Sequence, residues 1–341
     1  LEKAIEAYNN AINIKHDYFE AYYNMGNALK DQNMLEEAVQ IYKKAIVFKP
    51  DYFEAFYNMG NALKELNNLE EAIEAFKKAL SIKPDFAEAY NNMGIALKER
   101  SKIYEAIETY NKALLLKPDY PKAYNNMGIS LTGIIFKKPN KGLQNTIGSL
   151  LEKKIYVRPA DIAVTAISLL KLEPSLKKLL KKVRSVEVIQ NPLDIISELD
   201  ELPLLRKLMS ICPLPDLELE KLFKNLRASI LENISSLKES SPELLRFQSA
   251  LALQCFTNEY IYSHTEEEEK IIKSLDSSVR KTLESNEQPS PQLILALASY
   301  KALIEYDWYK LLTVTDHIRE VFVRQIEEPN QEKKIKIDLP V

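Results

Sequence analysis

Glycine is scarce in this sequence. Only 7 of its 341 residues are glycines, and four of them, Gly26, Gly60, Gly94 and Gly128, recur at one fixed step along the chain. A phosphate-binding loop or a dinucleotide-binding turn needs several glycines close together, directly before a helix. The remaining glycines are scattered and do not meet that requirement. The sequence therefore argues against a site for a nucleotide or S-adenosylmethionine, and we expect no cofactor.

Cysteine and histidine are scarce as well. Cys212 and Cys255 have no CxxC spacing, and the 3 histidines lie far apart in the sequence. A zinc site needs such ligands at short spacings, so we expect no metal. Two isolated cysteines are typical of small apolar side chains in a reducing compartment, and we expect a cytoplasmic protein. No apolar run is long enough to span a membrane and no signal-peptide pattern is present, so no membrane partner is expected.

One octapeptide returns four times at the same step as the glycines. It reads YYNMGNAL, FYNMGNAL, YNNMGIAL and YNNMGISL. Other positions keep the same register, and in the first complete unit these positions are Tyr22, Met25, Gly26, Leu29, Ala38, Tyr42, Ala45 and Pro50. Their offsets of three and four residues place the apolar side chains on one face of a helix. We therefore expect pairs of antiparallel helices that approach closely at the small residues Gly26 and Ala38. Pro50 would end the second helix, and Asp51 would cap the next.

This pattern resembles the tetratricopeptide repeat (TPR), whose units of about 34 residues have the same order of aromatic, small and proline positions. Tyr or Phe stands here where the family has Trp. The resemblance covers residues 1–132 and implies a superhelical solenoid whose first helices line a concave surface. Residues 1–17 match the second helix of a unit without its first helix, so their apolar face would be open. We therefore expect that a longer array precedes this chain, and that oligomers form through the open end.

An asparagine precedes the methionine in every copy of the octapeptide. The polar positions of each first helix are three or four residues apart, so they share one face, away from the apolar stripe. The residues that we predict to bind a peptide are Glu20, Asn24, Asn27, Glu54, Asn58, Asn61, Glu88, Asn92 and Asn126. A primary amide both donates and accepts, which suits an extended peptide backbone, and the carboxylates would favour basic ligands. The alternative is simple copying of recent repeats, because Lys30, Lys64 and Lys98 recur as regularly.

The repeat pattern stops after residue 132. Pro139, Asn140 and Gly142 stand where the second helix of the fourth unit would begin, which predicts a linker or boundary over residues 133–158. Residues 159–341 show helix signals without a repeat, and we predict a second, all-helical domain. The whole chain is therefore predicted to be all-α.

Helix-start signals support this interpretation of the second domain. Asp216, Ser241 and Ser290 are predicted N-caps, the two serines each standing before a proline. Thr265 with Glu268 forms a predicted capping box, which gives the acidic run after Thr265 a structural explanation.

Charge is distributed unevenly. Residues 1–136 carry a net charge of −3, residues 137–186 of +9 and residues 187–341 of −9. A basic segment can attract nucleic acid or an acidic membrane surface. However, no aromatic residues alternate with the lysines as base stacking would require, and SLKKLLKKV is typical of a short amphipathic helix. We therefore do not expect nucleic-acid binding.

The segment from about Arg158 onward resembles the helical middle region of bacterial proteins that join a TPR array to a C-terminal class I methyltransferase. YVRPADIAVTAISLLKLEP, FQSALALQCFTNEYIYSHTEEEE and VTDHIREVFVRQIEEPNQE are among the stretches that carry this likeness. It implies that the chain is the non-catalytic front portion of a larger methyltransferase, with the second domain as a regulatory or spacer region. Two alternatives remain open, the front of a TPR-containing glycosyltransferase and a stand-alone adaptor.

No set of catalytic residues emerges from the sequence. Ser263, His264 and Thr265 are neighbours along the chain, which rarely brings a nucleophile and a base face to face. Asp316 and His317 are equally typical of a helix start on the surface. We therefore expect a protein-interaction scaffold that holds a peptide ligand on the array, without catalytic activity in this chain.

Overall fold

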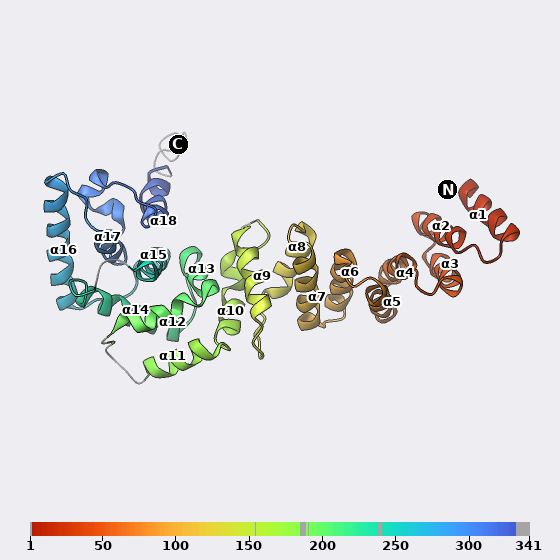
Figure 1. Ribbon diagram of the computed structural model, residues 1–341, viewed down its shortest axis with the longest axis horizontal. Coiled ribbons are helices and arrows are strands. Elements are labelled where there is room, and N and C mark those ends of the chain that lie inside the picture. Colours follow the sequence, from red (N-terminus) through yellow and green to blue (C-terminus); the bar gives the residue numbers. More distant parts are fainter. Residues whose placement is uncertain (1, 154, 185–188, 190, 238–240, 332–341) are drawn as a thin grey trace, which may run out of the picture. The chain divides into compact units, whose positions relative to one another are not determined.

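The computed structural model describes residues 2–153, 155–184, 189, 191–237 and 241–331, and all regular secondary structure within them is helical, as predicted. The chain divides into two compact units, and each is described by itself (Figure 1). Unit 1 comprises Leu1–Thr132 and Ile155–Val157, and unit 2 comprises Gly133–Lys154 and Arg158–Val341. The division into domains at 1–132, 133–158 and 159–341 stays a prediction.

Unit 1 is a stack of helix pairs. Its first helices are α2 (Phe19–Asp31), α4 (Phe53–Glu65), α6 (Ala87–Glu99) and α8 (Pro121–Leu131). Its second helices are α1 (Glu2–Ile14), α3 (Leu35–Phe48), α5 (Leu69–Ile82) and α7 (Ile103–Leu116). Each first helix from α2 to α6 packs against the second helix that follows it, and each second helix packs against the next first helix. The chain thus repeats one antiparallel contact in unit after unit.

Glycine is required where the two helices of a unit meet. A Cβ atom built on Gly60 would lie 2.8 Å from Cε1 of Phe76, a ring that is fully buried. The equivalent glycines of the preceding and following units would clash with the rings of Tyr42 and Tyr110 at 2.6 and 2.5 Å. The predicted close approach is therefore confirmed. The group that fills the space is the aromatic ring of the second helix, while the buried Ala38 lies elsewhere in the interface.

The turns inside the units follow the same repeat. Asn33, Asn67 and Ser101 connect the first helix to the second, and their φ angles are 61°, 60° and 61°. Asparagine adopts this left-handed conformation more readily than most residues, which explains its recurrence there. The cap predicted at Asp51 is wrong. The N-cap of α4 is Tyr52, because the helix begins one residue later than a capping Asp51 would need. The side chain of Tyr52 forms no cap hydrogen bond.

The fourth unit is completed by a non-helical segment. Tyr156 stacks on Tyr124 of α8, with ring centroids 5.5 Å apart and an interplanar angle of 6°. A Cβ atom on Gly128 would lie 3.1 Å from the carbonyl oxygen of Tyr156 and 3.2 Å from Cβ of Val157. Residues 155–157 therefore cover the glycine that a second-helix ring covers in the earlier units.

Unit 2 is built from helices of unequal length. They are α9 (Lys141–Glu152), α10 (Pro159–Leu170), α11 (Pro174–Arg184), α12 (Pro192–Asp200), α13 (Pro203–Ile211), α14 (Leu217–Glu232), α15 (Pro242–Thr257), α16 (Glu266–Glu284), α17 (Pro291–Ala298) and α18 (Arg319–Phe322). Two 3₁₀ turns, η1 (Leu303–Glu305) and η2 (Asp307–Leu311), and a π-helical turn, η3 (Val323–Glu327), complete the described part. Its core surrounds Trp308, whose Nε1 donates to a carboxylate oxygen of Asp276 at 2.5 Å.

Most of the predicted helix starts of unit 2 are confirmed. Asp216 accepts hydrogen bonds from two backbone N–H groups of α14, and the side chain of Ser241 accepts one at the start of α15. Thr265 and Glu268 form the predicted capping box of α16. Ser290 occupies the N-cap position of α17, but its side chain forms no cap hydrogen bond.

Helix α9 lies inside the segment 133–158 and was not expected from the sequence. Leu143, Ile147 and Leu150 on this helix are buried, and Asn140 is its N-cap, accepting from the N–H of Leu143 at 2.9 Å. The proline, asparagine and glycine that signalled an irregular segment therefore mark the start of a helix.

Replacing Gly60 by Ala should destabilise unit 1. The new methyl group would meet the Phe76 ring, and we expect a loss of about 1–3 kcal/mol in the free energy of unfolding. Gly148→Ala is the matched control, because that helical glycine on α9 has nothing within 4 Å of its Cβ position. It should be neutral or stabilise by up to about 1 kcal/mol.

Circular dichroism during urea unfolding would measure the free energy of unfolding of both variants. The emission of Trp308, the single tryptophan of the sequence, reports unit 2 separately and should be unchanged by Gly60→Ala. Equal stabilities of Gly60→Ala and the parent chain would contradict the interpretation of the glycines.

Candidate functional site

The asparagines of the first helices lie beside one another, and hydrogen bonds join those of successive units. Nδ2 of Asn58 on α4 donates to Oδ1 of Asn27 (2.9 Å) and to the hydroxyl of Tyr23 (3.0 Å), both on α2. The same Oδ1 of Asn27 accepts from the hydroxyl of Tyr42 at 2.7 Å. Burial raises the pKa of Tyr42 well above its usual range, so this phenol remains a donor.

The same arrangement returns in the next unit. Nδ2 of Asn92 donates to Oδ1 of Asn61 (2.8 Å) and to the hydroxyl of Tyr57 (3.0 Å). The row then continues with a changed partner, because Nδ2 of Asn126 donates to Oδ1 of Asn91 at 3.0 Å. Asn91 stands where the earlier units have a tyrosine. These contacts form a continuous polar row across four first helices, which we call the asparagine row.

The row leaves some polar atoms for a ligand. Asn58 uses both amide hydrogens on α2, whereas its Oδ1 accepts no hydrogen bond from the described residues. The Oδ1 of Asn126 is in the same situation. Asn24 on α2 is exposed and forms no side-chain hydrogen bond within the described part of the chain. These amides can therefore accept backbone N–H groups of a bound chain, and Asn24 can also donate.

The predicted glutamates differ in their surroundings. Glu88 forms an ion pair with Lys117 at 2.9 Å, and this hydrogen bond lowers the pKa of its carboxyl. Glu20 and Glu54 are half-buried and have no ion pair among the residues that the structure describes. Both lie near Tyr52, whose pKa is raised to about 12, mainly by burial and further by these charges. Two of the three carboxylates thus have no ion-pair partner among the described residues.

Sequence reasoning identified the asparagines but missed their partners. The structure brings Asn27, Asn58, Asn61, Asn92 and Asn126 into one row, while Asn24 lies at its end without a partner among the described residues. Tyr23, Tyr57 and Asn91 were missed, although each stands directly before an asparagine of the octapeptide. The signal available in the sequence was that a side chain able to form hydrogen bonds recurs at this position in each of these units.

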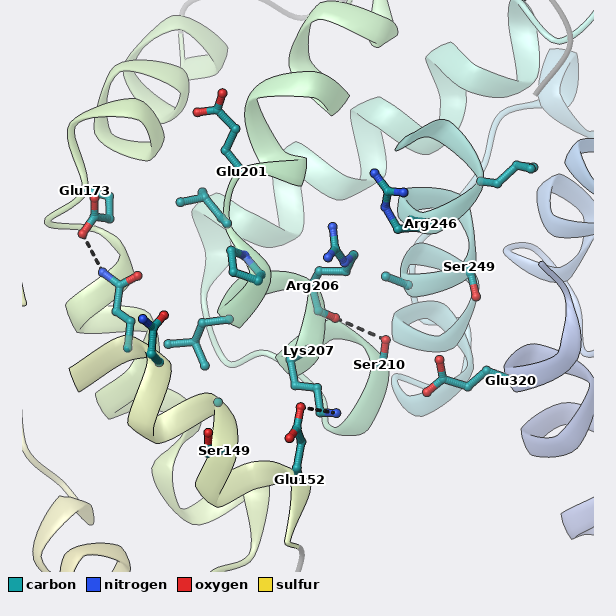
Figure 2. Close-up of a pocket in the computed structure, with 18 of the residues that line it drawn as sticks. Ser149, Glu152, Glu173, Glu201, Arg206, Lys207, Ser210, Arg246, Ser249 and Glu320 are labelled. Atoms are coloured by element: carbon teal, nitrogen blue, oxygen red, sulfur yellow. Dashed lines mark hydrogen bonds and ion pairs between the residues drawn. The ribbon is translucent and has the colours of Figure 1, made fainter. Parts of the chain in front are cut away.

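Unit 2 contains an open groove of about 980 Å³ between α9, α13 and α15. Figure 2 shows Arg206 on α13 and Arg246 on α15 side by side within it, with Glu320 near one end. Its basic side chains are largely paired within the chain, for example Lys207 with Glu152 at 3.5 Å. The groove therefore presents a balanced mixture of charges.

Asp200 at the end of α12 connects α13 and α15. Its carboxylate pairs with the guanidinium of Arg206 and, at 2.6 Å, with that of Arg246. Arg246 also approaches Glu243 at 3.6 Å. The hydrogen bond from Arg246, together with the charge of Arg206, lowers the pKa of Asp200. One carboxylate thus holds two arginines at the groove.

The catalytic candidates from the sequence do not come together. The hydroxyl of Ser263 accepts from Lys224 at 2.8 Å, whereas Nε2 of His264 contacts a carboxylate oxygen of Glu269 at 3.0 Å. Thr265 is held in its capping box. Within the described residues, no group of three or more His, Cys, Asp or Glu side chains is arranged to hold a metal ion. In the same part of the chain, no helix is both long and apolar enough to cross a membrane.

Asn58→Ala should loosen the stack of units, because it removes two donated hydrogen bonds between α4 and α2. We expect a loss of about 1–3 kcal/mol in the free energy of unfolding of unit 1. Asn24→Ala changes the equivalent residue of the preceding unit, which has no partner among the described residues, and should stay within about 0.5 kcal/mol of the parent. Urea titrations followed by circular dichroism decide this. Equal effects of the two changes would show that the row does not stabilise the array.

Asp200→Asn should reduce the stability of unit 2 in a pH-dependent way. The folded-state pKa of Asp200 lies below its unfolded value, so its ion pairs stabilise the fold above a pH of about 4 and are lost at lower pH. We expect Asp200→Asn to cost about 1–2 kcal/mol at neutral pH, and this cost should shrink as the pH falls through the lowered pKa of Asp200. Trp308 fluorescence during denaturation measures this, with the exposed Asp194→Asn as control. A cost that is independent of pH would contradict the ion-pair role.

Comparisons with known proteins support the interpretation of unit 1. A family model described as "TPR repeat" matches residues 1–33, 26–67, 60–101 and 96–132. A comparison with curated proteins gave no match.

Solved structures with similar arrays include YrrB, described as a TPR protein with an unusual peptide-binding site. It is 22% identical, covers 52% of this chain and 91% of its own, and has a TM-score of 0.40. MamA from Desulfovibrio magneticus RS-1 is 20% identical, with coverage of 54% and 88% and a TM-score of 0.38. The first TPR of Spaghetti (RPAP3), bound to an HSP90 peptide, is 23% identical, with coverage of 33% and 89% and a TM-score of 0.32. These scores are too low to support a statement about function.

The family model, the repeat register and the recurring contact between glycine and aromatic ring agree with one another. They concern the same part of the chain. Residues 1–132 are therefore tetratricopeptide repeats, and the assignment to this family rests on that part of the chain alone.

Proposed function

We propose that residues 1–132 form a protein-interaction scaffold that holds an extended peptide along the asparagine row. The supporting observation is the row itself, in which amides of successive units repeat at one position. The Oδ1 atoms of Asn24, Asn58 and Asn126 accept no hydrogen bond from a described residue, whereas that of Asn92 accepts from Asn91 at 3.1 Å. An extended backbone offers N–H groups at regular intervals and can pair with such amides whatever its side chains are. Asn24, Asn27, Asn58, Asn61, Asn92 and Asn126 are the proposed contacts.

The charges beside the row suit a ligand with basic side chains. Glu20 and Glu54 have no ion pair among the described residues, whereas Lys117 already compensates Glu88. A lysine or arginine of the ligand would contact the carboxylates of Glu20 and Glu54, and it would gain less electrostatic stabilisation from that of Glu88. A basic ligand is therefore favoured along α2 and α4.

Unit 2 has a regulatory or spacer role in this proposal. Its support is the likeness of the stretches after Arg158 to the middle region of TPR–methyltransferase proteins, so a methyltransferase is the proposed parent enzyme. The front part of a TPR-containing glycosyltransferase and a stand-alone adaptor are the alternatives. The chain itself carries no catalytic role in any of these. A cytoplasmic location is proposed on the buried free thiols Cys212 and Cys255.

A peptide library tests the proposal directly. Immobilised short peptides, with basic, acidic and neutral members, are incubated with the full chain, and affinities of the best binders are measured by fluorescence anisotropy. Glu20→Gln with Glu54→Gln should weaken basic peptides about tenfold and leave neutral ones unchanged, because only charge is removed. Asn58→Ala with Asn92→Ala should weaken all bound peptides, measured where circular dichroism shows the variant to be folded.

The groove of unit 2 provides the matched control. Asn145→Ala with Ser149→Ala changes two groove residues and leaves unit 1 untouched. Binders that respond to this change and ignore the asparagine changes would place the peptide on unit 2 and overturn the proposal. A library without any binder selected through residues 1–132 would overturn it as well.

A further inference from the structure

Large apolar side chains stand exposed at the end of every second helix. Ile14, Val47 and Leu115 are 88%, 74% and 63% exposed, respectively. The equivalent positions of successive units with exposed apolar residues are Ile14, Phe48, Ile82 and Leu116. Phe48 stacks on Tyr22, with ring centroids 5.5 Å apart, but packing in the array leaves these side chains at least partly exposed. Exposed apolar groups of this kind, repeated along a surface, are typical of an interaction site.

Charge on the second helices is divided between their two halves. The first seven residues of α3, α5 and α7 contain the carboxylates Glu36, Glu37, Glu70, Glu71, Glu74, Glu105 and Glu108 and no lysine. The last seven contain Lys43, Lys44, Lys77, Lys78 and Lys112 and no carboxylate. This order complements the helix dipole, which accounts for the charges. It does not account for the exposed apolar residues.

The units stack in register, so each half forms one edge of unit 1. The repeated hydrogen bonds between residues 35 positions apart, Asn58 to Tyr23 and Asn92 to Tyr57, establish this register. The basic edge carries the lysines together with Val47, Phe48, Ile82, Leu115 and Leu116. The acidic edge carries the glutamates together with Met34 and Tyr104, which are also exposed. On the second helices, both edges thus combine charge with apolar side chains, and these charges are opposite. The first helices place charges of the other sign beside them, because Glu88 pairs with Lys117 at the basic edge and Arg100 pairs with Glu70 at the acidic edge.

Both edges repeat once per unit, because they belong to the same helices. A partner with an unrelated sequence would have to match the distance between successive helix ends, whereas a second copy of this chain matches it by construction. Charge complementarity and spacing therefore favour a second copy as the occupant.

We propose that the basic edge of one chain docks on the acidic edge of a second chain. Such a contact joins two different surfaces, so it leaves one edge free at each end and continues to longer assemblies. The lysines and aspartates of the loops after the helices, such as Lys49 and Asp51 or Lys83 and Asp85, oppose each other in sign and contribute little to this contact. The asparagine row lies on the first helices and takes no part in it.

A charge exchange between two variants tests the contact. One variant carries Lys44→Glu and Lys78→Glu, which leaves its basic edge with three lysines against two new glutamates. The other carries Glu37→Lys and Glu71→Lys, which leaves its acidic edge with five glutamates against two new lysines. Sedimentation velocity at low salt should give association for the parent chain that rises with concentration over about 1–100 µM, and single-chain species for each variant alone. An equimolar mixture of the two variants should associate again.

Further variants separate the contributions. Val47→Ser with Leu115→Ser should weaken parent association at least about tenfold without altering the circular dichroism. Lys270→Glu with Lys281→Glu places the same charge change on the exposed surface of α16 in unit 2 and should leave association unchanged.

Four results would overturn the proposal. The first is a parent chain that stays a single species throughout the concentration range. The second is a variant mixture that does not associate although both variants are folded. The third is equal loss of association with the α16 control, which would assign the effect to overall charge. Closed dimers that persist in both charge variants would also contradict the edge contact.

Discussion

The contact between a glycine of the first helix and an aromatic ring of the second is the constraint on which unit 1 depends. At Gly60 and Phe76 there is no room for a single methyl group, so the two helices lie as close as their backbones permit. A packed interior does not absorb extra volume without displacement. Because the contact recurs from one unit to the next, it fixes the position of each first helix relative to its neighbour. The asparagine row exists only because those helices are held at one spacing.

In the proposed function, the asparagine row combines two tasks in the same side chains. The amide hydrogens of Asn58 and Asn92 join successive units, while the proposed ligand would use the acceptor oxygen of amides such as Asn58 and Asn126. A hydrogen-bond network polarises its members, so a ligand that binds an amide oxygen strengthens the N–H groups that donate to the neighbouring unit. If a peptide binds there as proposed, binding and stacking of the repeats would be coupled, and the bound peptide would stiffen the array along its length.

Much of the fold could be predicted from local sequence. The repeat period placed the helices of unit 1, and capping patterns placed the starts of α14, α15 and α16, because periodicity and caps depend on residues within one or two turns. The features that were not predicted correctly depend on contacts between residues distant in sequence, or on a shift of one residue in where a helix begins. The cap at Asp51 failed by one residue. Helix α9 was missed because a helix start and a loop share proline, asparagine and glycine. The pairing of Asp200 with Arg246 joins helices that no local pattern connects.

The end of the array has a consequence for how such a protein can grow in evolution. Repeats multiply by duplication of a whole unit, and a new unit fits wherever its neighbours present a free helix surface. After α8 that surface is taken, because the Tyr156 ring stacks on Tyr124 and the Tyr156 carbonyl closes the space beside Gly128. Duplication inside the array preserves every contact, whereas an insertion after residue 132 would have to displace this segment. The junction therefore acts as a stop for repeat expansion, and length variation among descendants is expected in the units before it.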